Sequence, residues 1–221
     1  MERLEDLGVL DYKIYQNDEL YCFTSDSIIL SRFARVKKGD VVADFCSGSG
    51  VVGIHLFALN SQVVESVTLF EMQKSLFDLS VKSIAVNNLG EKFSAVNVKL
   101  QEIPSEYNGK FSLIVCNPPY MPLGNGEESK DYSKAVCKSE MELSLEELIS
   151  AVNKALKYGG RFAMVHRSDR LTDIICCMRK YNIEPKRLQF VYGKGKAPYL
   201  LLIEGVKGGK KGITVLENTL N

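Results

Sequence analysis

The stretch Val41-Val42-Ala43-Asp44-Phe45-Cys46-Ser47-Gly48-Ser49-Gly50-Val51-Val52-Gly53 decides the fold of this 221-residue chain. Residues 41–45 read as a short buried strand, a glycine-rich turn follows, and Ile54 to Leu59 continue as a helix. A strand, a glycine-rich turn and a helix form the geometry that holds nucleotide cofactors in α/β proteins. Glycines let the backbone approach a ligand closely, and the start of a helix offers free N–H donors. The stretch therefore predicts a nucleotide-cofactor site.

Two carboxylates stand at the ends of strands near this turn. Asp44 precedes Gly48 by four residues, where it can hold the amino group of an aminoacyl ligand. The apolar run Val67-Thr68-Leu69-Phe70 ends at Glu71, and a carboxylate at that position can accept the two hydroxyls of a ribose. Gly48, Gly50 and Gly53 also fit the dinucleotide fingerprint G-x-G-x-x-G. NAD is therefore an alternative ligand, and Asp44 argues against it because a dinucleotide turn requires no carboxylate there.

A second motif, Asn117-Pro118-Pro119-Tyr120, directly follows the apolar run Phe111–Cys116. Prolines fix φ at about −65° and cannot continue a strand ladder, so the motif forms a fixed loop. The Asn117 side-chain oxygen and the Pro118 carbonyl are two acceptors for an NH2 group, and the Tyr120 ring can stack on a planar substrate. The alternative is a turn that only ends the strand. Hydride transfer by NAD does not require such a loop, so the motif is a second argument against NAD.

Patterns of strands and helices alternate from residue 41 onward. This alternation predicts an α/β fold with a mostly parallel sheet and helices on both faces. The last two strands are expected at Leu188–Val191 and Tyr199–Glu204. Ahead of residue 41 we expect a hairpin that pairs Tyr12–Gln16 with Glu19–Phe23, followed by a helix over Ser25–Arg35.

Two further segments stand out. Ser144-Leu-Glu-Glu147 predicts a capping box at the start of a helix. Met121 to Leu143 is long and polar, and we expect it to become ordered over the substrate because loops of this length are usually functional or disordered.

Together, Asp44-x-x-x-Gly48-x-Gly50, Glu71 and the Asn-Pro-Pro-Tyr motif resemble the class I S-adenosylmethionine-dependent methyltransferases that act on exocyclic or amide nitrogens. Phe23–Leu30, His166–Leu171 and Pro185–Leu188 extend the likeness. The ordered set is similar to the bacterial tRNA1(Val) (adenine-37-N6)-methyltransferase family, over nearly the whole chain. The resemblance implies a Rossmann-like class I methyltransferase fold with a seven-stranded sheet.

The resemblance also implies a cofactor, S-adenosyl-L-methionine, and a set of site residues. The implied catalytic residues are Asn117, Pro118 and Tyr120, with Pro119 and Tyr120 on the substrate base. The implied cofactor residues are Thr24, Asp26, Asp44, Gly48, Gly50, Glu71 and Asn117. For Thr24 and Asp26 the alternative is a helix N-cap and a first-turn acid. After the third strand the family often has an Asp for the cofactor adenine, whereas this chain reads Val96-Asn-Val-Lys-Leu-Gln-Glu102, so no residue is assigned to that role.

The distribution of charge favours a nucleic-acid partner. Residues 1–150 carry 14 Lys and Arg against 22 Asp and Glu, a net charge of −8, whereas residues 151–221 carry 14 against 5, a net charge of +9. A basic segment beside the active face attracts a polyanion, and the resemblance implies tRNA at its anticodon loop. The candidate residues are Arg167, Arg170, Lys186, Arg187, Lys194, Lys196, Lys210 and Lys211. The alternative is solvated charge or, for Arg170, an ion pair with Asp173 or Asp169.

Composition sets the remaining expectations. No apolar run approaches the roughly 18 residues of a spanning helix, and the acidic N-terminus lacks the features of a signal peptide, so a cytoplasmic protein is expected. The six cysteines form no C-x-x-C pair, and neither they nor the two histidines have a metal-ligand spacing. We expect one methyltransferase domain over residues 1–221, with an N-terminal extension to residue 40, a catalytic core over 41–205 and a basic tail over 206–221.

Two other functions share these features. Asn-Pro-Pro-Tyr also resembles the release-factor glutamine methyltransferases, whose acceptors hold a side-chain amide. Those enzymes carry an additional N-terminal helical domain, whereas the residues before Val41 read as a hairpin and one helix, which disfavours a protein substrate. A non-catalytic RNA-binding module of the same fold is the third possibility, and the intact motifs argue against it.

Overall fold

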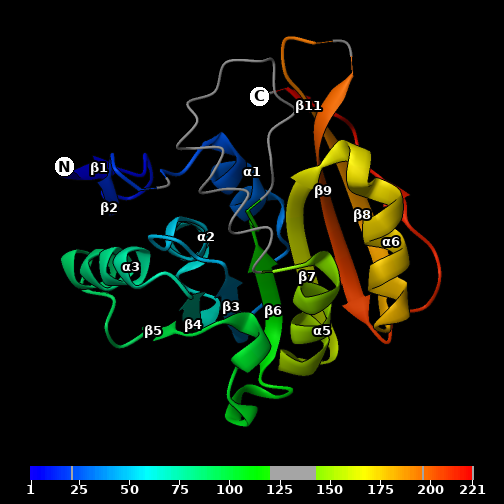
Figure 1. The fold of residues 1–221 in the computed structure, drawn as a ribbon, viewed down its shortest axis with the longest axis horizontal. Coiled ribbons are helices and arrows are strands. Elements are labelled where there is room, and N and C mark those ends of the chain that lie inside the picture. Colours follow the sequence, from blue (N-terminus) through cyan, green and yellow to red (C-terminus); the bar gives the residue numbers. More distant parts are fainter. Residues whose placement is uncertain (21, 120–142, 196, 221) are drawn as a thin grey trace.

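Two β-sheets organise the chain in the computed structural model, which describes residues 1–20, 22–119, 143–195 and 197–220 (Figure 1). The small sheet pairs β1 (Glu2–Asp6) with β2 (Lys13–Asn17). The large sheet contains β3 (Asp40–Phe45), β4 (Val64–Glu71), β5 (Phe93–Asn97), β6 (Phe111–Cys116), β7 (Leu156–Arg167), β8 (Ile183–Tyr192), β9 (Pro198–Lys207), β10 (Thr214–Val215) and β11 (Thr219–Leu220). Its strand order is β10-β8-β9-β7-β6-β3-β4-β5, and β11 pairs with β8.

The large sheet is mostly parallel, as predicted. Strands β3 to β7 run parallel to one another, and β9 runs antiparallel to both β7 and β8. The described residues form nine strands in this sheet, two more than the expected seven. The additional strands β10 and β11 have two residues each and lie along β8. Segments of this length are too short to show an alternating pattern in the sequence.

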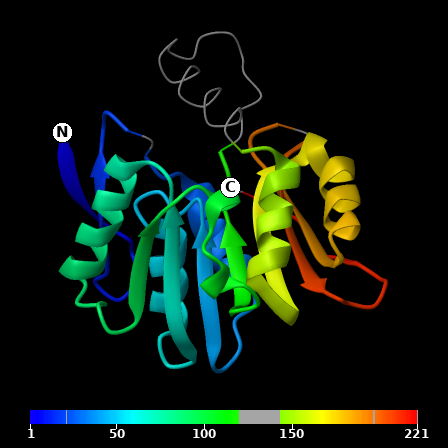
Figure 2. The same cartoon turned by 60° about the horizontal axis from the view of Figure 1, so that its bottom comes forward.

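Helices cover both faces of the large sheet (Figure 2). The helices of the chain are α1 (Ser25–Phe33), α2 (Val51–Asn60), α3 (Lys74–Val86), α5 (Leu145–Ala155) and α6 (Leu171–Lys180), with short 3-10 turns at η1 (Leu100–Glu102), η2 (Ser105–Tyr107) and η3 (Ser168–Arg170). Helices α1, α2 and α3 pack on one face, and α5 and α6 pack on the other. Successive strand residues point to opposite faces, so Val42 joins the first cluster and Ala43 the second.

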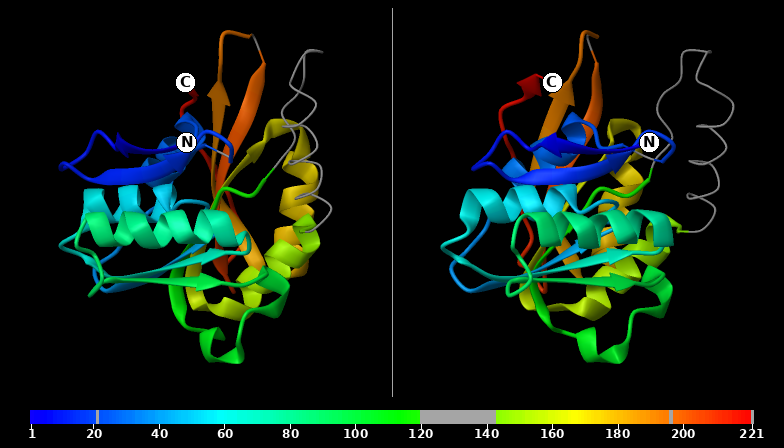
Figure 3. Two further views of the ribbon diagram at one scale, coloured as in Figure 1. Left: turned by 60° about the vertical axis from the view of Figure 1, so that its left-hand side comes forward. Right: turned by 90° about the vertical axis from the view of Figure 1, so that its left-hand side faces the viewer.

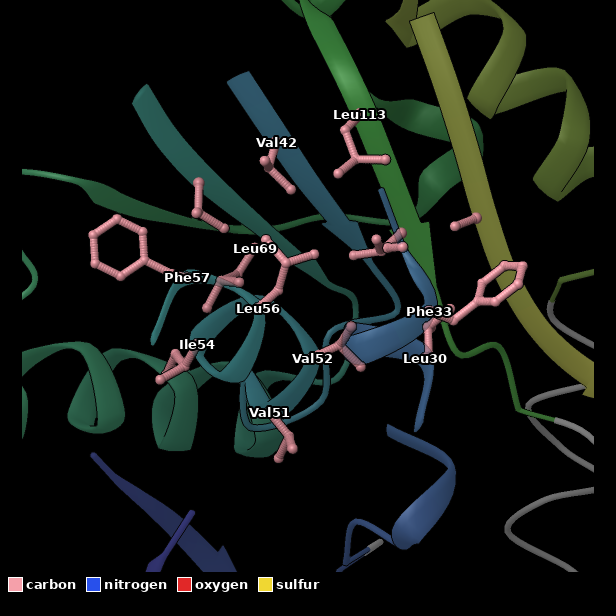
Figure 4. Packing of buried hydrophobic residues seen from close by; sticks show 14 of the residues in the cluster. Leu30, Phe33, Val42, Val51, Val52, Ile54, Leu56, Phe57, Leu69 and Leu113 are labelled. Atoms are coloured by element: carbon pink, nitrogen blue, oxygen red, sulfur yellow. The ribbon is translucent and has the colours of Figure 1, made fainter. Parts of the chain in front are cut away.

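The first face shows how the glycine-rich stretch becomes part of the core. Figure 4 shows Leu56 of α2 beside Val42 and Leu69 of the sheet, with Ile54 of the same helix farther from Val42. All four side chains have a relative exposure of 0%. The packing of α2 against β3 and β4 therefore fixes the turn between β3 and α2.

The parallel strands all end at one edge of the sheet, called here the carboxyl edge. Strand β3 lies between β4 and β6, so the order of the strands reverses between β3 and β6. In open α/β sheets, ligands bind outside the carboxyl ends of strands at such a switch point. The turn after β3 and the Asn117 loop after β6 both lie there.

The N-terminal hairpin differs from the prediction. Strand β2 pairs with β1, with Glu2 opposite Asn17, and Glu19, Leu20, Cys22 and Phe23 belong to no strand. The Tyr15 N–H donates to Ser83 Oγ of α3 at 3.0 Å. One edge of β2 is thus taken by β1 and the other by α3, so no edge is left for residues 19–23. The expected helix over Ser25–Arg35 is confirmed as α1, which ends two residues earlier.

The predicted capping box at Ser144 is confirmed. Ser144 Oγ accepts the Glu147 N–H at 3.3 Å, and Glu147 Oε2 accepts the Ser144 N–H at 2.8 Å. We predict that Ser144→Ala lowers the free energy of unfolding by about 1 kcal/mol, or about 2–4 °C in Tm for a chain of this size. Glu147→Gln is the control, because Gln also serves in a capping box. Thermal unfolding of both variants checks this, and an unchanged Tm for Ser144→Ala would contradict it.

Cys22, Cys46, Cys116, Cys176 and Cys177 are free thiols, and Cys137 lies outside the described residues. In the described part of the chain, no helix has the length and apolar character needed to cross a membrane. The same residues contain no group of three or more His, Cys, Asp or Glu side chains that could hold a metal ion.

Candidate functional site

The turn between β3 and α2 has left-handed backbone at three residues. Cys46 has φ 56°, Gly48 φ 56° and Gly50 φ 95°. A Cβ on Gly50 would lie 2.9 Å from Leu69 Cδ1, whereas a Cβ on Gly48 would have no atom within 4 Å. Gly50 is therefore needed for close packing against β4. Gly48 leaves open space above the turn, where a ligand can approach the backbone.

Asp44 is a fully buried acid at the end of β3. Its relative exposure is 0%, and Oδ2 accepts the Gly53 N–H at 2.8 Å. Among the described residues, Asp44 Oδ1 has no hydrogen-bond partner. Burial raises the pKa of Asp44 to about 8, the Gly53 N–H opposes that shift, and the nearby Glu71 charge adds to it. A buried carboxylate oxygen is costly unless it is paired, so a cationic group of a ligand fits this position.

Ser47, in the turn after β3, has a second unpaired atom. Its side chain is 6% exposed, and Oγ has no partner within the described residues. Buried polar atoms are nearly always hydrogen-bonded in folded proteins. Two such atoms, one at the end of β3 and one in the turn that follows it, lie beside the open space at Gly48 and indicate a polar ligand.

Glu71 is hydrogen-bonded to the turn between β3 and α2. Its side chain is 6% exposed, Oε2 accepts the Gly48 N–H at 2.9 Å, and Oε1 accepts the Gln73 N–H at 2.8 Å. Burial raises the pKa of Glu71, and the backbone N–H groups of Gln73 and Gly48 oppose that shift. A carboxylate oxygen accepts more than one hydrogen bond, so these contacts are compatible with the predicted ribose role, which stays a prediction. No pattern in the sequence indicates that Glu71 links the backbone at Gly48 to that at Gln73.

Asn117 lies next to the start of α1. Its Nδ2 donates to Ser27 Oγ at 3.1 Å, and Ser27 is 4% exposed. This contact places the start of α1, with Thr24 at the N-cap and Asp26 in the first turn, close to the loop after β6. Thr24 occupies the N-cap position of α1, but its side chain makes no capping hydrogen bond. Its hydroxyl is therefore not used in the alternative role of a cap, and Asp26 lies in the first turn as expected.

The rest of the Asn-Pro-Pro-Tyr motif is described only in part. Pro118 is buried and Pro119 half-buried, as expected of a fixed loop. Tyr120, to which stacking was assigned, lies outside the described residues, and so do residues 121–142 of the expected substrate cover. The structure thus brings Asp44, Gly48, Glu71 and Asn117 to one edge of the sheet.

The basic candidates do not form one face. Arg167 ends β7 at the carboxyl edge and Arg170 follows in η3, where they pair with Asp169 and Asp173 respectively. Lys186 lies near the start of β8, and its Nζ donates to the Lys210 carbonyl at 3.0 Å. Because β9 runs antiparallel to β7, its end and the following Lys210 and Lys211 lie at the opposite edge, as the arrowheads in Figure 1 show. The expectation that these residues all stand beside the active face is therefore wrong for Lys186, Lys210 and Lys211.

Arg187 has a structural position. Its Nη1 lies 3.3 Å from Glu204 Oε2 and donates to the Phe33 carbonyl at 3.1 Å. The guanidinium also stands 4.5 Å from the centre of the Phe33 ring, and the side chain is 12% exposed. These contacts join α1 to the sheet and occupy Nη1 of Arg187.

Two residues that the sequence did not single out join the site to the N-terminal segment. They are Ser27, described above, and Gln16, which is 1% exposed and donates from Nε2 to Ser49 Oγ in the glycine-rich turn. Gln16 Oε1 accepts the Phe23 N–H at 3.0 Å. The sequence could not predict these contacts, because a single Gln or Ser does not indicate which distant residue it will meet.

Comparison with known proteins gives relatives of modest identity. The chain is similar to the tRNA1(Val) (adenine(37)-N6)-methyltransferase of Shewanella putrefaciens, at 25% identity over 70% of this chain and 65% of that protein. The protein of the same name from Shewanella halifaxensis is 22% identical over 85% of this chain and 76% of its own length. The chain thus spans 65% of the first of these relatives.

Solved structures show the same fold. A predicted O-methyltransferase from Agrobacterium tumefaciens matches with a TM-score of 0.69 and 15% identity, over 88% of this chain and 86% of that one. Trm5 of Methanocaldococcus jannaschii, solved with adenosine, matches with a TM-score of 0.65 and 14% identity, over 95% of this chain and 56% of that one. The Rossmann-like methyltransferase fold is thereby confirmed. The family model described as the methyltransferase small domain matches residues 24–173, more than half of the sequence, and the chain belongs to that family.

Proposed function

We propose that this protein transfers a methyl group from S-adenosyl-L-methionine to the N6 amine of an adenine in tRNA. The relatives are named for adenine 37 of tRNA1(Val), and we infer the same nucleotide, beside the anticodon. We further infer that residues 1–221 act as one domain, in the cytoplasm. One observation carries the proposal: Asn117 Nδ2 donates to Ser27, which leaves Oδ1 as an acceptor at the edge that also carries Asp44 and Glu71.

The cofactor supplies a methyl group on a positively charged sulfur. Asp44 Oδ1 can accept a hydrogen bond from the amino group of the cofactor. The ammonium would pair with a buried carboxylate oxygen that has no partner among the described residues. Glu71 suits the ribose hydroxyls, and the open backbone at Gly48 allows close approach. Thr24, Asp26, Gly50 and Asn117 complete the proposed set.

Asn117 and Pro118 have the central role toward the substrate. The lone pair of an adenine N6 amine is delocalised into the ring, so the amine is a weak nucleophile. If Asn117 Oδ1 and the Pro118 carbonyl accept its two N–H bonds, the nitrogen can become pyramidal, and the acceptors stabilise the positive charge that develops on it. No strong base is required, and the remaining task is alignment. Tyr120 stacks on the base in this proposal, and stacking contributes about 1–3 kcal/mol in comparable sites.

Calorimetry tests the cofactor, and methyl transfer tests the substrate. Tight binding of S-adenosylmethionine or S-adenosylhomocysteine is expected, whereas NAD binding without response to either would overturn the proposal. Labelled cofactor is then offered with total tRNA or with release factor. Label in tRNA at adenine N6, located by mass spectrometry, is the expected result. Label in release factor would favour the glutamine methyltransferase alternative, and cofactor or RNA binding without transfer would favour a non-catalytic module.

We propose that tRNA lies over the carboxyl edge, where a base can reach Asn117. An anticodon loop is single-stranded, so its bases leave their stack at low cost. Arg167 and Arg170 stand at that edge, paired with exposed carboxylates. Exposed ion pairs are weak, so these side chains can exchange their partners for phosphates. Lys194, exposed in the turn after β8, adds a further charge.

The salt dependence of tRNA binding tests this placement. We predict that replacing Arg170 and Lys194 together by alanine raises the KM for tRNA several-fold and lowers the slope of log affinity against log salt by about 1–2. Replacing Lys210 and Lys211 together should have the smaller effect, because these residues lie at the opposite edge. Binding titrations from low to physiological salt decide. A larger effect of the Lys210 and Lys211 pair would place the RNA on the other edge.

A further inference from the structure

We propose that Gln16 and Ser27 are positioning residues of the methyl-transfer site. This proposal rests on the function proposed above. Gln16 ties the N-terminal hairpin to the glycine-rich turn, and Ser27 ties α1 to Asn117. The segment from β2 to α1 would then set the cofactor turn and the substrate acceptor in one geometry. Each residue acts through another: Gln16 through Ser49, and Ser27 through Asn117.

The hydrogen bonds of Gln16 support the first half of this proposal. Its amide donates to Ser49 Oγ and to the Tyr15 carbonyl, the latter at 3.0 Å, and accepts the Phe23 N–H at 3.0 Å. Ser49 lies in the turn between Gly48 and Gly50 and is 5% exposed. Both ends of a buried amide are therefore used, and removal of the amide leaves partners unpaired.

The hairpin that carries Gln16 is itself held firmly. Lys13 N–H donates to Asn87 Oδ1 at 2.8 Å, and Asn87 Nδ2 donates to the Lys13 carbonyl at 2.6 Å. Tyr15 N–H donates to Ser83 Oγ, also on the α3 side. Figure 3 shows the hairpin lying along α3 in both views. Helix α3 begins three residues after Glu71. The helix that holds the hairpin of Gln16 therefore also directly follows the strand end that carries Glu71.

The contact of Ser27 supports the second half. A planar amide presents an oxygen on one side and an NH2 group on the other, and only the oxygen can accept an N–H bond from a substrate amine. Because Nδ2 donates to Ser27 Oγ at 3.1 Å, Oδ1 is turned away from α1. Ser27 is buried, and its own N–H donates to the Thr24 carbonyl at 3.2 Å. Leu30, in the next turn of α1, is fully buried in the core, so α1 is a fixed support.

The hydrogen bonds of Gln16 and of Ser27 hold neighbouring parts of the N-terminal segment. Gln16 holds Phe23 and Ser27 holds Asn117, and only Thr24, Ser25 and Asp26 lie between Phe23 and Ser27. Thr24 and Asp26 are in the proposed cofactor set. Two separate effects are therefore expected. Loss of the Gln16 hydrogen bonds should weaken cofactor binding, and loss of the Ser27 hydrogen bond to Asn117 should slow turnover.

The test replaces each side chain by one of similar shape that lacks the hydrogen bonds. Gln16→Met should raise the Kd for S-adenosylmethionine about tenfold, with kcat at saturating cofactor close to wild type. Ser27→Ala should lower kcat about tenfold with a Kd close to wild type, and Ser27→Thr, which keeps the hydroxyl, should recover much of the loss. Ser49→Ala removes the contact of Gln16 from the other side and should repeat the effect on Kd if Gln16→Met fails to fold.

Two matched controls remove similar bonds elsewhere. Gln189→Met removes a donor to the Glu217 carbonyl, and Ser94→Ala removes a donor to Thr68 Oγ1. A wild-type Kd in both Gln16→Met and Ser49→Ala, or a wild-type kcat in Ser27→Ala, would overturn the inference. So would equal losses in the controls, because these would indicate general destabilisation. A wild-type protein that binds no S-adenosylmethionine would overturn the proposed function itself.

Discussion

Replacement of Asn117 by alanine should lower kcat for adenine methylation by about 10²–10³-fold, a far larger change than the rise in the Kd for S-adenosylmethionine. The magnitude is that of removing one preorganised group from a site where transition-state charge develops. Asn117 Oδ1 would contact the reacting amine, whereas Asp44 and Glu71 stand at the ends of β3 and β4 and would hold the cofactor without it. The expected loss is therefore in the chemical step.

Single-turnover kinetics with tRNA and calorimetry with the cofactor separate these effects. Asn60→Ala is a matched control, because Asn60 Nδ2 donates to the Leu56 carbonyl at the end of α2, away from the carboxyl edge. Methylation at the wild-type rate by Asn117→Ala would reduce the Asn-Pro-Pro-Tyr motif to a turn that ends β6. A parallel loss of kcat and cofactor affinity would mean that Asn117 chiefly holds the cofactor.

Replacement of Asp44 by asparagine should weaken cofactor binding at pH 8 by about 100-fold or more, because the ammonium of the ligand would lose a buried counter-charge. In the wild type, the pKa of Asp44 is raised to about 8 by burial. The carboxyl must lose its proton to pair with an ammonium, so wild-type affinity should rise about 50-fold between pH 6 and pH 8. The variant should lack this rise. Calorimetry across that range provides the measurement, and a pH-independent wild-type Kd would contradict the assignment.

The same substitution should stabilise the ligand-free protein above neutral pH. The folded pKa of Asp44 lies above the ordinary value of 3.8, so the folded state keeps a proton that the unfolded state loses. Stability of the wild type therefore falls as the pH rises from about 4 to about 8, and this contribution then levels off. Asp44→Asn has no such dependence and should melt at a higher temperature than wild type at pH 8, with the difference shrinking toward pH 5. A lower Tm for the variant at pH 8 would contradict this.

Local sequence was sufficient for the features that local chemistry controls. The strand, turn and helix over residues 41–59 could be predicted because glycine spacing and apolar periodicity act over a few residues. The prolines after Asn117 likewise end β6 without help from the rest of the chain. The capping box at Ser144 and Glu147 is also local, and it was predicted correctly. The family resemblance rested on these same motifs.

Tertiary structure decided which distant groups meet. β2 pairs with β1 because α3 occupies its other edge. Lys210 and Lys211 lie away from Asn117 because β9 reverses direction, which a count of charges along the chain does not reveal. Gln16 meets Ser49 across 33 residues and Ser27 meets Asn117 across 90. The sequence by itself thus determined the fold class and the site motifs, whereas the orientation of Asn117 and the bracing of the cofactor turn depend on packing between elements far apart in the chain.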